Sequence, residues 1–211
     1  IAQMMKEHNR KDLYDKYMEL SRNYRNYFDP ETKLMRGRLS DGSWITPFDP
    51  VSVQRPSNYV EGNAWQWAWF VPQDVEGLME LVGGQKYFEA HLDTLFTTSS
   101  ELTGDPNAAA DVTGMIGQYA HGNEPSHHVI HLYNYVNRPW RTQELVDSVY
   151  RSQYANNVDG LSGNEDCGQM SAWYILNSMG FYQVCPGKPV YSIGRPAFDK
   201  AVINLPNEKT F

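Results

Sequence analysis

The amino-acid sequence predicts a mainly α-helical fold, a toroid of (α/α) helical hairpins in which this chain forms about half of an (α/α)6 barrel. Apolar residues recur at helical spacing in about six segments, and glycine or proline separates these segments into consecutive pairs. From residue 182 onward the pattern changes to short strands and turns. We therefore expect residues 1–181 to be part of the toroid and residues 182–211 to begin a truncated β-strand region.

The first predicted helix covers about residues 5–28, because apolar and charged residues alternate there with helical periodicity. Asp29-Pro30 ends it, since the residue before a proline disfavours helical backbone. Glycines and prolines predict loops or short strands over residues 34–58. The other predicted helices cover about residues 63–82, 85–97, 125–136, 139–154 and 168–180.

Composition excludes several classes of function. The formal net charge of −7 argues against a nucleic-acid partner, because phosphate binding needs a basic surface. No apolar run is long enough to predict a membrane span. Cys167 and Cys185 give no disulfide framework. The chain begins at Ile1 without a start methionine, and we interpret both ends as cuts inside a longer protein.

Aromatic residues make up 13% of the chain, including 14 tyrosines and 6 tryptophans. Such side chains either fill a helical core or form platforms that stack on sugar rings. Arg36 and Arg38 flank a glycine in an aromatic-rich turn, which could line a sugar pocket or form a loop held by internal ion pairs.

Two polar clusters, Gly122–His128 and Gly163–Gln169, stand immediately before predicted helices. A helix N-terminus has free backbone N–H donors and the positive end of the helix dipole. Both clusters therefore place carboxylates where the local potential is positive. Carboxylates at two helix N-termini in a tryptophan-rich domain indicate acid/base chemistry on a polyhydroxylated substrate.

Glu61 precedes a predicted helix with three tryptophans. Loss of hydration beside aromatic rings raises a carboxyl pKa, as a general acid requires, whereas the helix dipole lowers it. Glu61 is otherwise a surface carboxylate at a helix N-terminus. Asp166 either caps the following helix or, kept ionised by backbone donors, acts as a general base. Asn164 could orient the attacking water or contact a hydroxyl.

Asn123 and Glu124 offer the hard oxygen ligands that Ca²⁺ prefers, with water and substrate oxygens completing the coordination. His127 and His131 stand four residues apart, which is also a zinc-ligand spacing, although such a pair is more often a packed or solvated polar face.

Four strings together resemble the α-mannosidases of glycoside hydrolase family 92 over about residues 24–187. They are RNYFDPETKLMRGRLSDGSWITPFDP, YVEGNAWQWAWFVPQDVEGLMELVGG, DVTGMIGQYAHGNEPSHHVIHLYNYV and DGLSGNEDCGQMSAWYILNSMGFYQVCPG. The resemblance implies an N-terminal β-sandwich, absent from this chain, before the helical toroid. It implies a calcium-dependent, inverting exo-α-mannosidase that acts on mannose-containing glycans outside the cytoplasm, in the periplasm or the extracellular space, together with the remaining domains of the same polypeptide.

By position in these strings, Glu61 is expected to be the general acid and Asp166 the general base, with Glu124 as the alternative acid. Asn123 and Glu124 are expected to bind calcium. Substrate contacts are expected from Trp65, Asn164, Glu165, Glu124 and His128.

The chain departs from the family pattern at two positions. Asn164 stands where the family often has a second acidic residue, and Gln73 replaces a common histidine. Two alternative functions stay open: a relative that cleaves mannosyl phosphate, and an inactive carbohydrate-binding remnant. Glu61 argues against the first, because a phosphate leaving group needs less help from an acid, and the presence of both Glu61 and Asp166 argues against the second.

Overall fold

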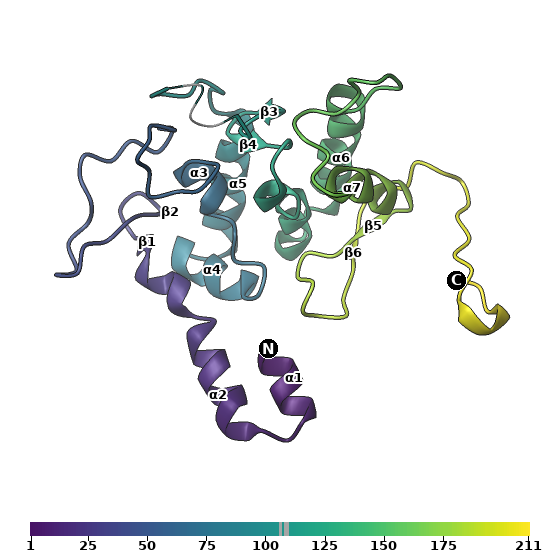
Figure 1. The fold of residues 1–211 in the computed structure, drawn as a ribbon, viewed down its shortest axis with the longest axis horizontal. Coiled ribbons are helices and arrows are strands. Elements are labelled where there is room, and N and C mark those ends of the chain that lie inside the picture. The colour runs from purple at the N-terminus through teal and green to yellow at the C-terminus, as the bar shows by residue number, and fades with distance from the viewer. Residues whose placement is uncertain (106, 108–109) are drawn as a thin grey trace.

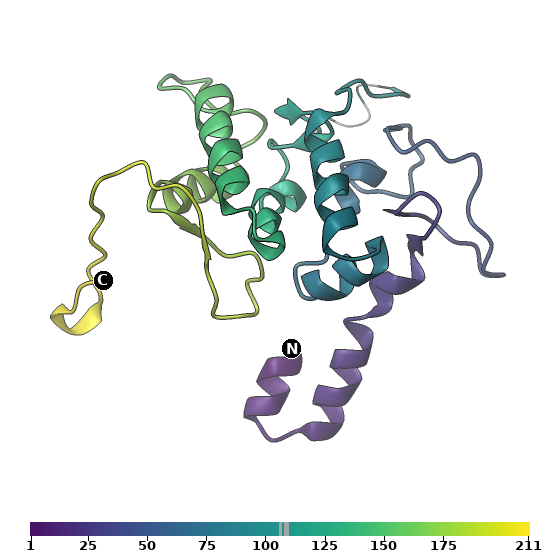
Figure 2. The same ribbon diagram turned by 180° about the vertical axis from the view of Figure 1, so that it is seen from behind.

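Short helices dominate the structure, a computed structural model that describes residues 1–105, 107 and 110–211. One group comprises α3 (Ala64–Trp67), α4 (Val75–Val82) and α5 (Gln85–Thr97), and a second comprises η4 (Val129–Val136), α6 (Pro139–Gln153) and α7 (Gln169–Ser178). The two groups lie side by side, with η4 packed against both α5 and α6 (Figures 1 and 2). The prediction of a mainly helical chain is confirmed.

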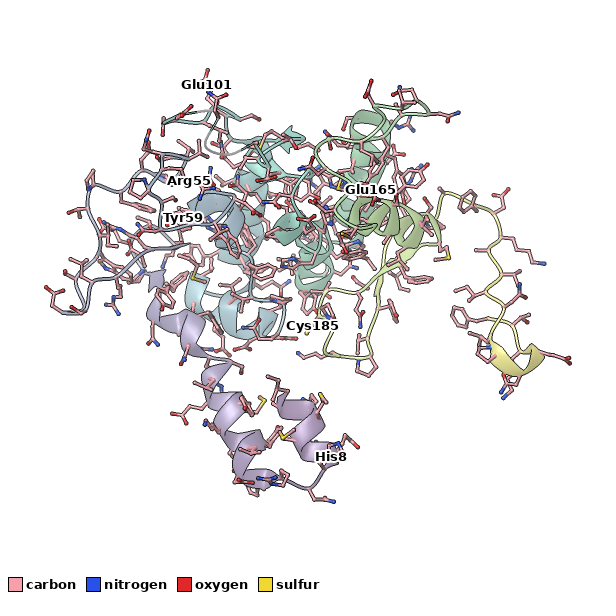
Figure 3. All side chains as sticks on the ribbon, viewed as in Figure 1. His8, Arg55, Tyr59, Glu101, Glu165 and Cys185 are labelled. Carbon is pink, nitrogen blue, oxygen red and sulfur yellow. The ribbon has the colours of Figure 1, made fainter. Side chains whose placement is uncertain are left out.

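The predicted first helix is divided into three. α1 (Ala2–Glu7) and α2 (Lys11–Leu20) form a hairpin, and the 3-10 helix η1 (Asn23–Asn26) follows. Asn9 adopts a left-handed conformation (φ 55°), which interrupts the helix between α1 and α2. The hairpin projects from the rest of the chain with His8 near its tip (Figure 3), and neither of its helices contains a buried residue.

The predicted helix over residues 63–82 is also divided, into α3 and α4. Asp74 starts α4 because its carboxylate accepts a hydrogen bond from the backbone N–H of Gly77. Pro72 lies between the two helices and lacks the N–H that a continuous helix needs. The segment predicted as helix over residues 125–136 consists of 3-10 turns, η3 (Glu124–Ser126) and η4. The predicted bounds of α5, α6 and α7 agree with the structure within two residues.

Three antiparallel pairs of two-residue strands complete the described elements. They are β1 (Phe28–Asp29) with β2 (Leu34–Met35), β3 (Met115–Ile116) with β4 (Tyr119–Ala120), and β5 (Phe181–Tyr182) with β6 (Ser192–Ile193). Of the short strands predicted after residue 182, the last described pairing is an isolated bridge between Asn204 and Thr210. The chain after β6 ends in the 3-10 turn η5 (Pro206–Glu208), apart from the helices (Figure 1).

The main core lies between the two helical groups and is rich in aromatic side chains. Trp69, Phe88, Tyr119, Tyr133 and Trp173 are each no more than 1% exposed. For these five residues, the core-filling interpretation of the aromatic content is correct. No helix among the described residues is both long and apolar enough to span a bilayer.

A buried amide network connects α5, the β3–β4 hairpin and α3. Gln118, which is fully buried, accepts a hydrogen bond from Asn63 Nδ2 at its Oε1 and one from Gln66 Nε2 at its backbone oxygen. Its own Nε2 donates to the carbonyls of Ser99 and Glu101. Asn63 and Gln66 form a capping box at the start of α3. The network therefore fixes the segment that carries Glu61.

Gly117 allows the β3–β4 hairpin to approach the end of α5. It has φ +59°, and a Cβ atom there would lie 2.7 Å from the backbone carbonyl carbon of Phe96. We expect Gly117→Ala to lower the free energy of unfolding by about 2 kcal/mol more than Gly42→Ala, because a backbone clash adds to the cost of positive φ.

Gly42 is the matched control, since it also has positive φ (+88°) but a Cβ atom added there would meet no other atom within 4 Å. Equal midpoints of denaturant unfolding for the two variants would contradict the proposed clash.

Candidate active site

The two polar clusters meet through their leading glycines. A Cβ atom on Gly163 (φ +80°) would lie 2.7 Å from the backbone oxygen of Gly122 and 3.0 Å from its Cα atom. Side chains at these positions would force the two loops apart, so glycine is required for their contact. As a result, the segments 123–124 and 164–166 both start at this contact and lie close together.

Three carboxyl groups come together beyond this contact. The carboxyl groups of Glu124 and Asp166 lie close enough to interact, and Glu61 lies within electrostatic range of Glu124. Burial, the interaction with the Asp166 carboxyl group and the charge of Glu61 raise the pKa of Glu124, while its own backbone N–H opposes them.

The backbone is strained at two of the three acidic residues. Glu61 and Asp166 each have φ +50°, and Cys167 next to Asp166 has φ +57°. Non-glycine residues in this region each cost about 1 kcal/mol or more and persist only where surrounding contacts hold them. The side chains of Glu61 and Asp166 are exposed, in contrast to Glu124.

Contacts hold both strained segments. Asn123 Nδ2 donates to the backbone oxygen of Glu61 (2.6 Å), and Trp67 Nε1 donates to the backbone oxygen of Val60 (2.7 Å). On the other loop, the N–H of Gln169 donates to the backbone oxygen of Asp166 (3.2 Å). The loop of Glu124 is therefore connected to the segments of both Glu61 and Asp166.

A pocket of about 450 Å³ opens beside this cluster. Glu124 and Asp166 line it together with other residues of the same two clusters and with residues from two further segments of the chain. These are Phe70, Pro72, His127, His128, Gln169, Tyr182, Gln183, Val184 and Pro186. Phe70 packs edge-to-face on His128, with ring centroids 5.9 Å apart, so the pocket combines acidic groups with an aromatic wall.

Glu165, and not Asp166, serves the N-terminus of α7. Its carboxylate accepts a hydrogen bond from the N–H of Ser171 (3.0 Å), and this contact lowers its pKa. The N-cap residue of α7 is Gly168. The interpretation of Asp166 as the helix cap is thus wrong, and its carboxyl group is left to face Glu124. Glu165 lies at the start of α7 in Figure 3.

The other predicted substrate contacts are not all placed at this pocket. His128 lines it, with Nε2 hydrogen-bonded to the backbone oxygen of Trp69 (2.8 Å). Asn164 is exposed and donates to Asp111 (3.4 Å). The ring of Trp65 packs at 5.1 Å from that of His91 and is not among the residues that line the pocket.

The polar atoms of Asn123 and Glu124 fit a hard cation. Glu124 Oε1 is buried without a hydrogen-bond partner, and Asn123 uses its Nδ2 on Glu61, which leaves its Oδ1 as the atom it can offer. Over the described part of the chain, no three His, Cys, Asp or Glu side chains form a metal-binding group by themselves. His127 and His131, considered for zinc, use their Nε2 atoms in hydrogen bonds to His121 O and Asn177 Oδ1.

Sequence reasoning missed several pocket residues. Tyr182, Gln183 and Val184 belong to the segment predicted as a separate β region, and no local pattern connects them to the acidic clusters. Gln169 is the last residue of the second cluster, so the sequence carried a signal for it.

Comparison with known proteins gives a consistent family. The profile described as "Glycosyl hydrolase family 92 catalytic domain" matches residues 1–211. A protein described as an uncharacterized secreted glycosidase of Arthroderma benhamiae is 26% identical over 215 residues, which cover 92% of this chain and 25% of that protein.

Two solved structures from Bacteroides thetaiotaomicron are similar over nearly the whole chain. The family GH92 α-mannosidase BT3965, in complex with mannoimidazole, has a TM-score of 0.90 and 44% identity, covering 99% of this chain and 28% of that protein. The GH92 inverting mannosidase BT2199 has a TM-score of 0.84 and 37% identity, with 99% and 29% coverage. The chain thus spans under a third of the length of these relatives.

Buried histidines around the pocket predict a loss of stability in acid. His128 and His131 are buried, and burial lowers the pKa of each to about 4 from 6.5. A depressed folded-state pKa gives stability that is present above pH 6.5 and is lost as the pH falls through about 4. Each histidine accounts for about 3 kcal/mol of the free energy of unfolding that is present at neutral pH and lost in acid.

We therefore expect the free energy of unfolding to fall between pH 6.5 and 4, with a smaller pH dependence in His131→Gln. The control is His8→Gln, because His8 is exposed on the α1–α2 hairpin and its replacement should leave the pH dependence unchanged. Equal slopes for all three proteins in chemical denaturation would contradict the assignment.

Proposed function

This chain belongs to glycoside hydrolase family 92, and we propose that the protein hydrolyses terminal α-linked mannose from glycans as an inverting exo-α-mannosidase. The observation that carries the proposal is the meeting of Glu124 and Asp166 at one pocket through two glycine-led loops, with Glu61 within electrostatic range of Glu124. Two similar structures, an α-mannosidase with bound mannoimidazole and an inverting mannosidase, support the substrate and the stereochemistry.

In the proposed reaction Glu61 protonates the leaving glycosidic oxygen, and Asp166 removes a proton from the water that attacks the opposite face of the sugar. Inverting enzymes leave room for this water, so we expect the two carboxyl groups to lie about 6.5–9.5 Å apart. The strained backbone of both residues supports these roles, because strain of this kind accumulates at functional sites.

Glu124 has a different proposed role. Its partly buried carboxyl group contacts Asp166 and is the one whose pKa is raised, which also makes it the alternative general acid. We place it at the floor of the substrate site, with His128 at the wall. Glu165, Asn164 and Trp65 are proposed as more distant contacts, with Glu165 mainly fixing the start of α7.

Calcium is the proposed cofactor. Asn123 Oδ1 and the orphaned Glu124 Oε1 would hold it, with substrate and water oxygens as further ligands. When bound, the ion would supply positive charge that orients sugar hydroxyls and favours distortion towards an oxocarbenium-like transition state.

The rest of the polypeptide is the proposed partner of this chain. We infer that its helices are part of an (α/α)6 toroid, with residues 1–181 in the toroid and 182–211 in a following β region. Tyr182, Gln183, Val184 and Pro186 of that second segment line the pocket, which supports a functional contact between the two. A periplasmic or extracellular location is proposed from the secreted glycosidase relative.

The assignment of the acid predicts a dependence on the leaving group. We expect Glu61→Gln to lower kcat/KM about 10²–10⁴-fold on mannobiose, whose leaving group needs a proton, and much less on an aryl α-mannoside with an acidic phenol. Steady-state kinetics of the protein on both substrates measures this. If Glu124→Gln shows the selective loss and Glu61→Gln does not, Glu124 is the acid.

The stereochemistry and the cofactor predict two direct observations. Proton NMR of the hydrolysis should show β-mannose as the first product, and α-mannose formed first would contradict inversion.

A calcium chelator should abolish release of the phenol from the aryl mannoside, and added Ca²⁺ should restore it. Activity that is unchanged by the chelator would remove calcium from the proposal.

A further inference from the structure

Gln169, the first residue of α7, connects the pocket to the histidines behind it. Its Nε2 lies 3.1 Å from His127 Nδ1 and 3.2 Å from the hydroxyl of Tyr182. Its side chain also lines the pocket that contains Glu124 and Asp166. The side-chain oxygen of Gln169 is the remaining polar atom, and it has no hydrogen-bond partner among the described residues.

His127 has a single consistent tautomer. Its Nε2 lies 2.9 Å from the backbone oxygen of His121, which can only accept, so Nε2 carries the hydrogen. The ring is 1% exposed, and burial lowers its pKa to about 4, so the imidazole is neutral. A neutral ring with hydrogen on Nε2 has a bare acceptor at Nδ1.

This tautomer fixes the orientation of the Gln169 amide. Only the NH₂ group can satisfy the Nδ1 acceptor, because an oxygen in its place would set two lone pairs against each other. The second hydrogen of the NH₂ group is donated to the hydroxyl oxygen of Tyr182. The ring of Tyr182 in turn stacks on His131, with centroids 5.3 Å apart. The amide therefore cannot flip without breaking two hydrogen bonds.

We propose that Gln169 is a substrate-contacting residue, whose side-chain oxygen is presented to the pocket by His127 and Tyr182 to accept a hydrogen bond from one hydroxyl of the bound sugar. The inference rests on the proposed function for the identity of the sugar. The inference gives His127 and His131 a positioning role. They fix the orientation of the Gln169 amide, His127 directly and His131 through Tyr182, and do not contact the substrate themselves.

The test is a scan of sugar hydroxyls by calorimetric titration of the whole protein with mannose and its monodeoxy derivatives. For the wild type, removal of the contacted hydroxyl should weaken binding ~10-fold. In Gln169→Met the same removal should change affinity less than ~3-fold, while the effects of removing the other hydroxyls persist.

Gln183→Met is the matched control, because Gln183 lines the same pocket but its amide donates to the backbone oxygens of Pro186 and Lys188. This variant should keep the wild-type pattern of selectivity. An equal loss for every sugar in Gln169→Met, or an unchanged wild-type pattern, would overturn the contact. Failure of the wild type to bind mannose would overturn it as well, whereas mannose binding without hydrolysis would refute the proposed function alone.

Discussion

The close contact of Gly122 with Gly163 is the constraint on which the site depends. It requires two loops, about forty residues apart in the chain, to run against each other without side chains between them. The calcium-ligand candidates on one loop and the proposed base on the other follow within three residues of the contact. The proximity of the Glu124 and Asp166 carboxyl groups is a consequence of this geometry, and burial together with this proximity raises the pKa of Glu124.

Around the contact, neutral polar groups provide rigidity where charged groups would cost more to bury. His127, His128 and His131 are buried with one hydrogen bond each at Nε2, and each has a depressed pKa. The aromatic core packs against them, with Trp173 Nε1 donating to the backbone oxygen of His127. Because these rings are neutral, they can orient neighbouring groups without adding charge beside the acidic side chains of Glu124 and Asp166.

Much of this was accessible from sequence because it is local. The apolar periodicity and the flanking glycines gave the bounds of α5, and Pro139 marked the start of α6. The division of the predicted helix over residues 63–82 was missed because apolar residues recur on both sides of the break, although Pro72 and Asp74 both mark it. The two acidic loops stood out as motifs, but their contact, the capping role of Glu165 and the contribution of Tyr182 are tertiary facts that no spacing encodes.

The amide network of Gln118 has an evolutionary consequence. Asn63, Gln66 and Gln118 satisfy one another in the interior, so replacing one alone leaves a buried donor or acceptor unpaired, at a cost of about 1–3 kcal/mol. Substitutions at these three positions should therefore be rare. When they occur, apolar residues should replace all three amides together. Homologous sequences should show covariation here, even though none of these three side chains lines the pocket of Glu124 and Asp166.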